Sequence, residues 1–269
     1  MSKPLIFGSG VSSFKDSNGL MRVCEAAIDN GILCFDTAPS YRTEEVLAQT
    51  LSDVARRKGL GRESLAIQTK IDPIQMFQGD VENYFKAKLK AMRLDYVDAL
   101  LVHWPVRKYF MKTWEAMNKL KEAGLTRRVG ICNLRIEHLR ELQAEGIIPE
   151  ILQIECHPLN TFTAEKDFCA QQSIALQDYS PLCKMHPLLA ESPILKQMAE
   201  KYSRSIGSLI LRWHLDTAAT PIFTSKNVSR IAEYAAVDEF RLAADDIAAI
   251  ESLNINHKLY LESLVCPGF

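Results

Sequence analysis

Short apolar segments recur along the chain at a nearly constant spacing. Four of them begin at Ile32, Leu65, Val97 and Val129, so that successive starts are 33, 32 and 32 residues apart. This is the length of a unit in which a helix connects one strand to a parallel neighbour. Eight such units in about 250 residues make a (β/α)8 TIM barrel, an α/β fold. A doubly wound open sheet stays an alternative, because spacing alone does not show that a sheet closes.

The apolar segments have the composition of strands that are buried on both faces. Most lack alternation of apolar and polar residues, which is typical of a parallel sheet covered by helices. Amphipathic stretches such as Val46–Ala55 lie between them and predict those helices. No linker rich in proline, glycine or serine divides the chain, so we expect one domain over residues 1–269. The expected strands are Leu5–Phe7, Ile32–Phe35, Leu65–Gln68, Val97–Val102, Val129–Cys132, Ile151–Ile154, Ile174–Leu176 and Pro221–Phe223.

Composition and charge exclude several classes of partner. Hydrophobic residues make up 47% and charged residues 24% of the 269 residues, which is typical of a globular protein. The net charge of −1 gives no general attraction to nucleic acid. No apolar run reaches the roughly 18 residues of a membrane helix. The start, Met1 to Pro4, lacks the apolar stretch of a secretion signal. We expect a soluble cytoplasmic protein, monomeric by default, with neither nucleic acid nor membrane as partner.

The cysteines indicate free thiols in a reducing compartment. Their number is odd, and no CxxC pair or cysteine–histidine spacing of a metal site is present. Several lie in apolar strand segments, where a thiol behaves as a small hydrophobic group. We therefore expect no metal. The seven cysteines are Cys24, Cys34, Cys132, Cys156, Cys169, Cys183 and Cys266.

Four reactive side chains follow the ends of three consecutive predicted strands. Asp36 ends the second strand and Tyr41 follows it, while Lys70 ends the third strand and His103 the fourth. Each has an ordinary structural explanation when taken alone: a cap, a half-buried phenol, a solvated charge and a core histidine. In a barrel, however, the carboxyl ends of all strands meet at one rim, where active sites lie. Their coincidence there favours a catalytic cluster.

At these residues the sequence resembles the aldo-keto reductase superfamily. The matching pieces occur in the family's order and span residues from about 5 to 255, which makes the set specific although each piece alone is weak. The pieces are Phe35–Tyr41, Thr69–Lys70, Val102–Pro105, Val129–Asn133, Gln153–Pro158, Asp178–Leu182, Pro221–Ser225 and Arg230–Glu233.

The resemblance implies a nicotinamide-dependent reductase of aldehydes or ketones, with the family's catalytic tetrad at Asp36, Tyr41, Lys70 and His103. Tyr41 would donate a proton to the carbonyl oxygen, and Lys70 would stabilise the phenolate. A cation about 4 Å away contributes up to roughly 4 kcal/mol at an effective dielectric of 20. Asp36 would hold the ammonium, and His103 would hydrogen-bond and orient the carbonyl oxygen.

The resemblance also implies where the cofactor, NADP, binds. Asn133 and Gln153 would bind the nicotinamide carboxamide, and Tyr179 would stack on the ring. The other implied cofactor residues are two in the pyrophosphate loop and three near a helix start suited to an anion, which would receive the adenosine 2′-phosphate: Ser180, Leu182, Ser225, Lys226 and Arg230.

Departures from the family pattern affect both ligands. Thr224 replaces a usual lysine, so NAD stays an alternative cofactor, and Cys132 replaces a usual serine. Tyr234 replaces a usual asparagine and would pack on the adenine ring or face solvent. Ser12 stands where many members have a pocket tryptophan, so the substrate pocket should be wide, with Trp104 as its aromatic wall.

Two other functions remain open from the sequence. One is a regulatory or binding module that holds the nicotinamide cofactor with little turnover; the complete Asp36–Lys70 pair argues against it. The other is a barrel hydrolase or lyase that uses the same pair, which leaves Asn133, Gln153 and Tyr179 unexplained.

Overall fold

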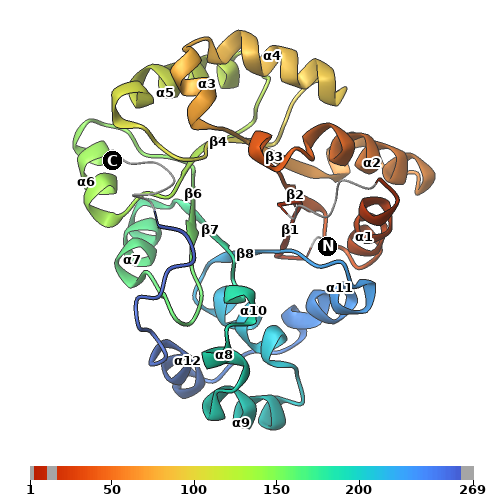
Figure 1. Cartoon of the computed structure of the whole chain (residues 1–269), viewed down its shortest axis with the longest axis vertical. Helices are drawn as coiled ribbons and strands as arrows, with labels where there is room; N and C mark the ends of the chain where they lie inside the picture. Colours follow the sequence, from red (N-terminus) through yellow and green to blue (C-terminus); the bar gives the residue numbers. More distant parts are fainter. Residues whose placement is uncertain (1–2, 11–16, 262–269) are drawn as a thin grey trace.

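Eight parallel strands close into a barrel in the computed structural model, which describes residues 3–10 and 17–261. The strands follow one another in chain order, and β1 pairs with β8 through Ile6 and Ile222 (Figure 1). That last pairing excludes the open sheet. The strands are β1 (Ile6–Gly8), β2 (Cys34–Asp36), β3 (Ala66–Ile71), β4 (Ala99–Val102), β5 (Val129–Cys132), β6 (Ile151–Glu155), β7 (Ala175–Tyr179) and β8 (Thr220–Phe223). Every expected strand is confirmed, with ends that shift by a few residues.

Helices surround the barrel and cover the outer face of its sheet (Figure 1). The α-helices are α1 (Ser17–Asp29), α2 (Glu44–Arg57), α3 (Pro73–Gln78), α4 (Val81–Met92), α5 (Arg107–Glu122), α6 (Ile136–Ala144), α7 (Thr163–Gln172), α8 (Pro187–Ala190), α9 (Pro193–Tyr202), α10 (Ile206–Asp216), α11 (Val228–Ala235) and α12 (Ala244–Glu251). Short 3-10 turns add η1 (Pro39–Tyr41), η2 (Arg62–Ser64), η3 (Cys183–Met185) and η4 (Ala236–Glu239).

The main apolar core lies between the strands and the inner faces of these helices. In α5, Phe110, Trp114, Met117 and Leu120 are buried at intervals of three and four residues, and they pack against apolar side chains of the neighbouring strands. Such burial contributes roughly 25 cal/mol per Å² of apolar surface. Because the helices remove the outer face of the sheet from water, each strand can be apolar on consecutive residues.

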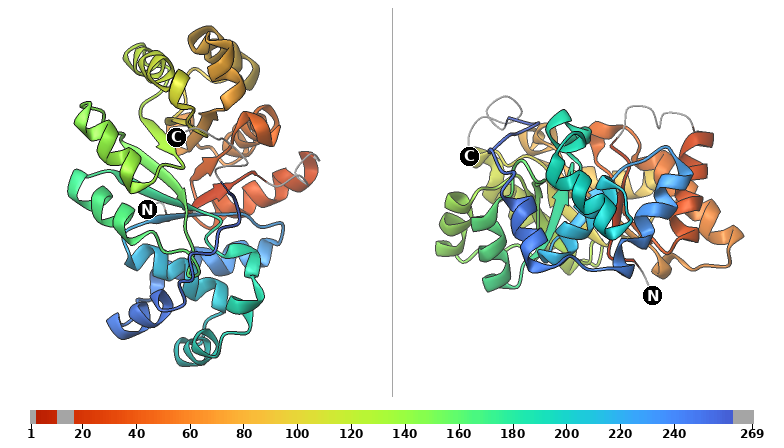
Figure 2. Two further views of the ribbon diagram at one scale, coloured as in Figure 1. Left: turned by 60° about the vertical axis from the view of Figure 1, so that its left-hand side comes forward. Right: turned by 90° about the horizontal axis from the view of Figure 1, so that it is seen from below.

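The two ends of the described chain lie on opposite faces of the barrel. β1 begins at Ile6 on one face, whereas Figure 2 shows the segment after α12 (dark blue) rising to the other face. That second face holds the carboxyl ends of the strands, so residues 252–261 come close to the place where function is expected. Nowhere in residues 3–10 or 17–261 is there a helix with the length and apolar character needed to cross a membrane.

Candidate active site

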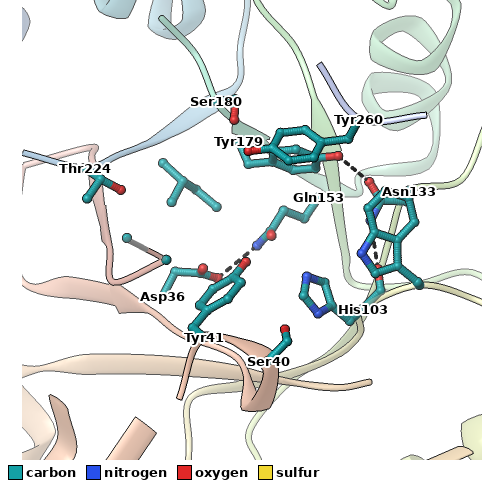
Figure 3. Close-up of a pocket in the computed structure, with 14 residues that line it drawn as sticks. Asp36, Ser40, Tyr41, His103, Asn133, Gln153, Tyr179, Ser180, Thr224 and Tyr260 are labelled. Carbon is teal, nitrogen blue, oxygen red and sulfur yellow. Dashed lines mark hydrogen bonds between the residues drawn. The ribbon is translucent and has the colours of Figure 1, made fainter. Parts of the chain in front are cut away.

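A pocket of about 300 Å³ opens at the carboxyl ends of the strands. Asp36, Tyr41, His103 and Trp104 line it, so the structure brings together most of the reactive side chains predicted from sequence (Figure 3). They come from the ends of β2 and β4 and from η1, which follows β2. Lys70 lies just behind this lining, within hydrogen-bond distance of two of its members. The closure of the barrel therefore makes one site from separate strand ends.

The Lys70 ammonium is completely enclosed by oxygen atoms and apolar groups. Its Nζ lies 2.7 and 2.8 Å from the two carboxylate oxygens of Asp36 and 2.9 Å from the carbonyl oxygen of Thr37. The hydroxyl oxygen of Tyr41 is the fourth neighbour, at 3.4 Å. Three short hydrogen bonds and a longer fourth one to Tyr41 fix the position of the charge. The Lys70 ammonium is thus held in a fixed position beside the Tyr41 hydroxyl.

Burial and charge act in opposite directions on Tyr41 and Lys70. Burial raises the pKa of Tyr41, and the Lys70 charge opposes this only in part, so that the pKa stays above its ordinary value. Burial by itself lowers the pKa of Lys70, but the Asp36 carboxylate outweighs it and holds that pKa above the usual range. Near neutral pH, Tyr41 is therefore a protonated phenol and Lys70 is a cation. The effect of burial on Tyr41 thus opposes the effect of the Lys70 charge that was expected from the sequence.

Two glutamines bind the Asp36 carboxylate inside the barrel, and a third glutamine binds both of them. Gln68 on β3 and Gln153 on β6 donate to its Oδ2 atom from distances of 2.7 and 3.1 Å. Gln177 on β7 exchanges two hydrogen bonds with Gln68 and accepts a third from Gln153. Gln68 and Gln177 were not singled out from sequence. Gln68 precedes Lys70 by two residues, so strand periodicity places both on the same face and was a usable signal.

Asp72, which follows β3, is a third residue of the site that was not singled out from sequence. Its Oδ1 atom is hydrogen-bonded to Nδ1 of His103, and its Oδ2 atom accepts the backbone N–H of Ser40 at 2.7 Å. The His103 ring also meets the Tyr41 ring edge to face, with centroids 5.6 Å apart. Asp72 and His103 are 31 residues apart in the chain, and no local pattern links them.

The residues expected to bind nicotinamide surround the far side of the pocket. Tyr179 is half-buried, and its hydroxyl donates to Oδ1 of Asn133 at 2.8 Å. Nδ2 of Asn133 donates in turn to the carbonyl oxygen of His103. The amide nitrogen of Gln153 is used by Asp36, whereas its Oε1 atom accepts no hydrogen bond from the described residues. An aromatic face and an amide oxygen are therefore offered to a ligand (Figure 3).

Tyr260, in the segment after α12, covers this part of the pocket. Its ring lies against Tyr179 with centroids 5.9 Å apart (Figure 3). The buried Glu155 carboxylate accepts the backbone N–H groups of Leu259 at 2.6 Å and Tyr260 at 3.0 Å. His157 also contacts Glu155, at 3.0 Å. No local pattern in the sequence predicts this contact, because about 100 residues separate the partners.

The expected phosphate site after β8 holds exposed cations. Lys226 and Arg230 are both exposed, so a phosphate group of a ligand could reach their charges. The N–H groups at the start of α11 are less available than expected, because Oδ1 of Asn227 accepts those of Ser229 and Arg230. Ser225 is buried and binds the backbone of Asn227. The charged side chains of Lys226 and Arg230 would therefore attract an anion more strongly than the N–H groups at the start of α11.

The other residues that were expected near the two ligands lie in different environments. Tyr234 does not face solvent: it is 4% exposed and packs edge to face on Phe223, with centroids 5.5 Å apart. A bulky residue at this position fits because Gly207 leaves room for the ring. Ser180 lines the pocket, whereas Leu182 packs against the core. Ser12 lies outside the described residues.

Comparison with known proteins gives one consistent family. Residues 4–255 match the sequence model described as the Aldo/keto reductase family. The glyoxal reductase of Bacillus subtilis (strain 168) is 34% identical over 254 residues, covering 94% of this chain and 90% of that protein. The methylglyoxal reductase DkgA of Escherichia coli (strain K12) is 32% identical over 257 residues, with 93% and 90% covered.

A solved structure agrees with the fold. The aldo-keto reductase AKR2E4 of Bombyx mori, determined in complex with NADP, superposes with a TM-score of 0.87 at 27% identity. The alignment covers 96% of this chain and 91% of that one. The architecture and the order of the strands are thus shared over nearly the whole chain.

Proposed function

Because the chain belongs to the aldo/keto reductase family, we propose that it reduces small aldehydes or ketones to alcohols with NADPH, using Tyr41 as the acid. NAD(P)H-dependent carbonyl reduction is the activity of this family. The assignment of steps to individual side chains is our own and rests on the geometry of the pocket.

One observation carries this assignment: the buried Lys70 ammonium lies between the Asp36 carboxylate and the Tyr41 hydroxyl, at the wall of a pocket. A lysine that served only stability would not need a phenol beside it at the pocket surface. A lysine that supports proton transfer needs this position, because its charge must stabilise the phenolate when the proton leaves.

Tyr41 donates its hydroxyl proton to the carbonyl oxygen as negative charge builds up there. The raised pKa keeps this proton in place until it is needed. Lys70 then faces the phenolate from 3.4 Å and offsets its charge. Asp36 keeps the ammonium charged and fixed, and the glutamines around Asp36 keep the carboxylate fixed in turn. Tyr41, Lys70 and Asp36 hold their positions before the reaction begins, so proton transfer requires little reorganisation of these side chains.

The residues around the pocket fit a nicotinamide cofactor. Tyr179 offers an aromatic face, Asn133 an amide, and Gln153 an unused amide oxygen that suits the carboxamide N–H groups. When bound, NADPH supplies a hydride to the carbonyl carbon. The chain's own part is to hold the ring beside the carbonyl that Tyr41 protonates.

We assign NADPH as the preferred cofactor because Lys226 and Arg230 are exposed near the end of β8. Ser225, buried between β8 and α11, orients the loop that carries them. Thr224 at the pocket edge supplies a hydroxyl in place of a charge, so that fewer cations contact the 2′-phosphate and NADH binds more weakly but measurably.

The substrate is a small polar carbonyl compound. The pocket is about 300 Å³ and is lined by hydroxyl, amide and imidazole groups as well as by Trp104. The similar proteins from Bacillus subtilis and Escherichia coli are named as reductases of glyoxal and methylglyoxal. Compounds of that size and polarity fit a pocket of this kind.

A cytoplasmic location suits this activity. All six cysteines within the described residues are free thiols, as in a reducing compartment: Cys24, Cys34, Cys132, Cys156, Cys169 and Cys183.

The test is to mix the protein with NADPH and a panel of aldehydes and ketones that includes glyoxal and methylglyoxal, and to follow NADPH absorbance. Consumption that depends on the carbonyl compound supports the proposal. Tight NADPH binding with no consumption across the panel would instead support a cofactor-binding module. The Asp36–Lys70 pair is the observation that favours turnover, since binding alone does not require it.

A further inference from the structure

Gln177 on β7 closes a ring of hydrogen bonds inside the barrel. Its Oε1 atom accepts hydrogen bonds from Nε2 of Gln68 at 2.8 Å and from Nε2 of Gln153 at 3.0 Å. The same two amide nitrogens donate to Oδ2 of Asp36, from 2.7 and 3.1 Å. Gln177 is 7% exposed and does not line the pocket, whereas Gln153 does. The ring therefore connects a residue at the pocket to one behind it.

The Asp36 carboxylate sets the direction of the bonds in this ring. A carboxylate only accepts hydrogen bonds, so Gln68 and Gln153 must face it with their amide nitrogens. The second protons of these nitrogens need another acceptor, and Oε1 of Gln177 supplies it. Nε2 of Gln177 then donates back to Oε1 of Gln68 at 2.9 Å. Turning over any one of the three amides would place two oxygens or two nitrogens against each other, so only one arrangement satisfies the ring.

This arrangement gives Gln153 an acceptor, and no donor, towards the pocket. Both protons of its Nε2 atom are used inside the barrel, by Asp36 and Gln177. Its Oε1 atom accepts no hydrogen bond from the described residues, and its side chain lines the pocket below Tyr179 (Figure 3). A ligand group that pairs with Gln153 must therefore donate a hydrogen bond.

We propose that Gln177 is a positioning residue for the cofactor: by accepting the second amide proton of Gln153, it keeps Oε1 of Gln153 turned to the pocket, where this oxygen selects a pyridine ring whose carboxamide donates an N–H. The proposal rests on the cofactor binding proposed above. Gln177 acts only through Gln153, and Gln68 fixes the direction of the Gln177 amide.

Two nucleotides that differ in one group test the acceptor. The 3-acetylpyridine analogue of NADP has a methyl group where NADP has the carboxamide NH₂, and both keep the carbonyl oxygen. We expect the protein to bind NADP about tenfold more tightly than the analogue, which is the effect of one hydrogen bond. Quenching of tryptophan fluorescence measures both affinities without turnover. Equal affinities, or tighter binding of the analogue, would overturn the proposal.

Gln177→Met removes the acceptor and keeps the length of the side chain. The second amide proton of Gln153 then has no partner inside the barrel, and leaving it buried costs more than turning it to the pocket, where water accepts it. Oε1 of Gln153 turns away from the pocket as a result, so we expect the preference for NADP to fall to about onefold. Gln171→Met, at an exposed glutamine of α7, is the matched control and should keep the preference.

Gln177→Glu keeps the acceptor in a side chain of the same shape. Burial and the neighbouring Asp36 carboxylate raise the pKa of the new carboxyl group, so that it stays protonated near neutral pH. Its carbonyl oxygen accepts from Gln68 and Gln153, and its hydroxyl donates to Oε1 of Gln68. We expect this variant to keep the preference for NADP. A purely structural role would not separate the two variants, so retention of the preference in Gln177→Met, or its loss in both, would contradict the proposal.

The Gln153 amide can also be followed in the unmodified protein. Labelling with ¹⁵N gives two proton signals for each side-chain amide, and Gln153→Met identifies those of Gln153. We expect both protons to exchange with deuterium at least about tenfold more slowly than those of Gln171, because each is bound inside the barrel. Rapid exchange of either proton would overturn the proposal, even if Gln177→Met does not fold.

The outcomes separate this proposal from the cofactor binding on which it rests. If neither nucleotide binds, the proposed cofactor is wrong, whatever the state of the Gln153 amide. If NADP binds and Gln177→Met keeps the preference over the analogue, only the role of Gln177 fails.

Discussion

The Tyr41 hydroxyl oxygen lies 3.4 Å from Nζ of Lys70, farther than the three oxygen atoms that already bind the ammonium. At this distance the hydrogen bond that the ammonium donates to the neutral phenol is weak. It becomes strong only when Tyr41 loses its proton, since a phenolate attracts the cation far more than a phenol does. The arrangement therefore favours the charge distribution reached during proton transfer over that of the resting protein.

Tyr41→Phe should remove the acid and keep the ring. General acid catalysis contributes about 100- to 10,000-fold, so we expect a loss of turnover in that range, with NADPH affinity unchanged. Steady-state rates and fluorescence titration with NADPH measure the two effects. Tyr109→Phe on α5 is the control, because its ring contact with Phe77 needs no hydroxyl. Substantial turnover by Tyr41→Phe would show that another group supplies the proton.

Lys70→Met should destabilise the protein as well as inactivate it. The variant leaves the Asp36 carboxylate buried without its cation, which costs about 3–5 kcal/mol of unfolding free energy. Adding Asp36→Asn removes the uncompensated charge, so the double variant should recover part of that stability but no activity. Urea denaturation and the carbonyl assay distinguish these effects. A double variant no more stable than Lys70→Met would contradict the charge argument.

His214 on α10 should make the protein less stable at mildly acidic pH. Burial lowers the pKa of His214 below its ordinary value of 6.5; Lys166 acts in the same direction, and Asp178 opposes it. The unfolded chain then binds a proton between the two pKa values and the folded chain does not, so stability is full above pH 6.5 and falls as the pH decreases. His214→Gln should reduce the loss of stability between pH 7.5 and pH 5.5 in urea titrations. An unchanged loss of stability in His214→Gln would show that other titratable groups cause the pH dependence.

Arg230→Ala should weaken NADPH binding by about tenfold, the effect of one hydrogen bond to a charged group, and should leave NADH binding unchanged. The tenfold loss of NADPH affinity should shrink at high salt, because Arg230 is exposed and salt screens its charge. Titrations with both cofactors at two salt concentrations measure it. Arg140→Ala, an exposed arginine on α6, should have no effect. Equal weakening of both cofactors would assign Arg230 a role other than binding the 2′-phosphate.

Glu155→Gln should release the segment that carries Tyr260. The carboxylate accepts two backbone N–H groups, and an amide nitrogen in place of one oxygen would face one of those donors. We expect faster trypsin cleavage after Lys258 in the variant, measured by mass spectrometry. Cleavage in α2 serves as the internal control. Equal cleavage rates after Lys258 in both proteins would mean that other contacts hold the segment.

Much of the cluster of reactive side chains at the pocket was predictable because each of its members follows a strand. Asp36 ends β2, Lys70 lies near the end of β3, and His103 follows β4. Closure of the barrel brings such positions to one rim whatever the details of packing. The direction of the Tyr41 pKa was not predictable in this way, because the degree of burial around the phenol depends on residues from many parts of the chain.

The amino-acid sequence alone determined the repeating unit and the reactive residue types, because strand and helix periodicity is set by backbone hydrogen bonds between near neighbours. Only the tertiary structure decided that Asp72 lies against His103, and that Glu155 holds the segment of Tyr260 over Tyr179. These contacts join positions between 31 and 105 residues apart. Partners at such separation are selected by how complete side chains pack and where charges are buried, and no local pattern contains that information.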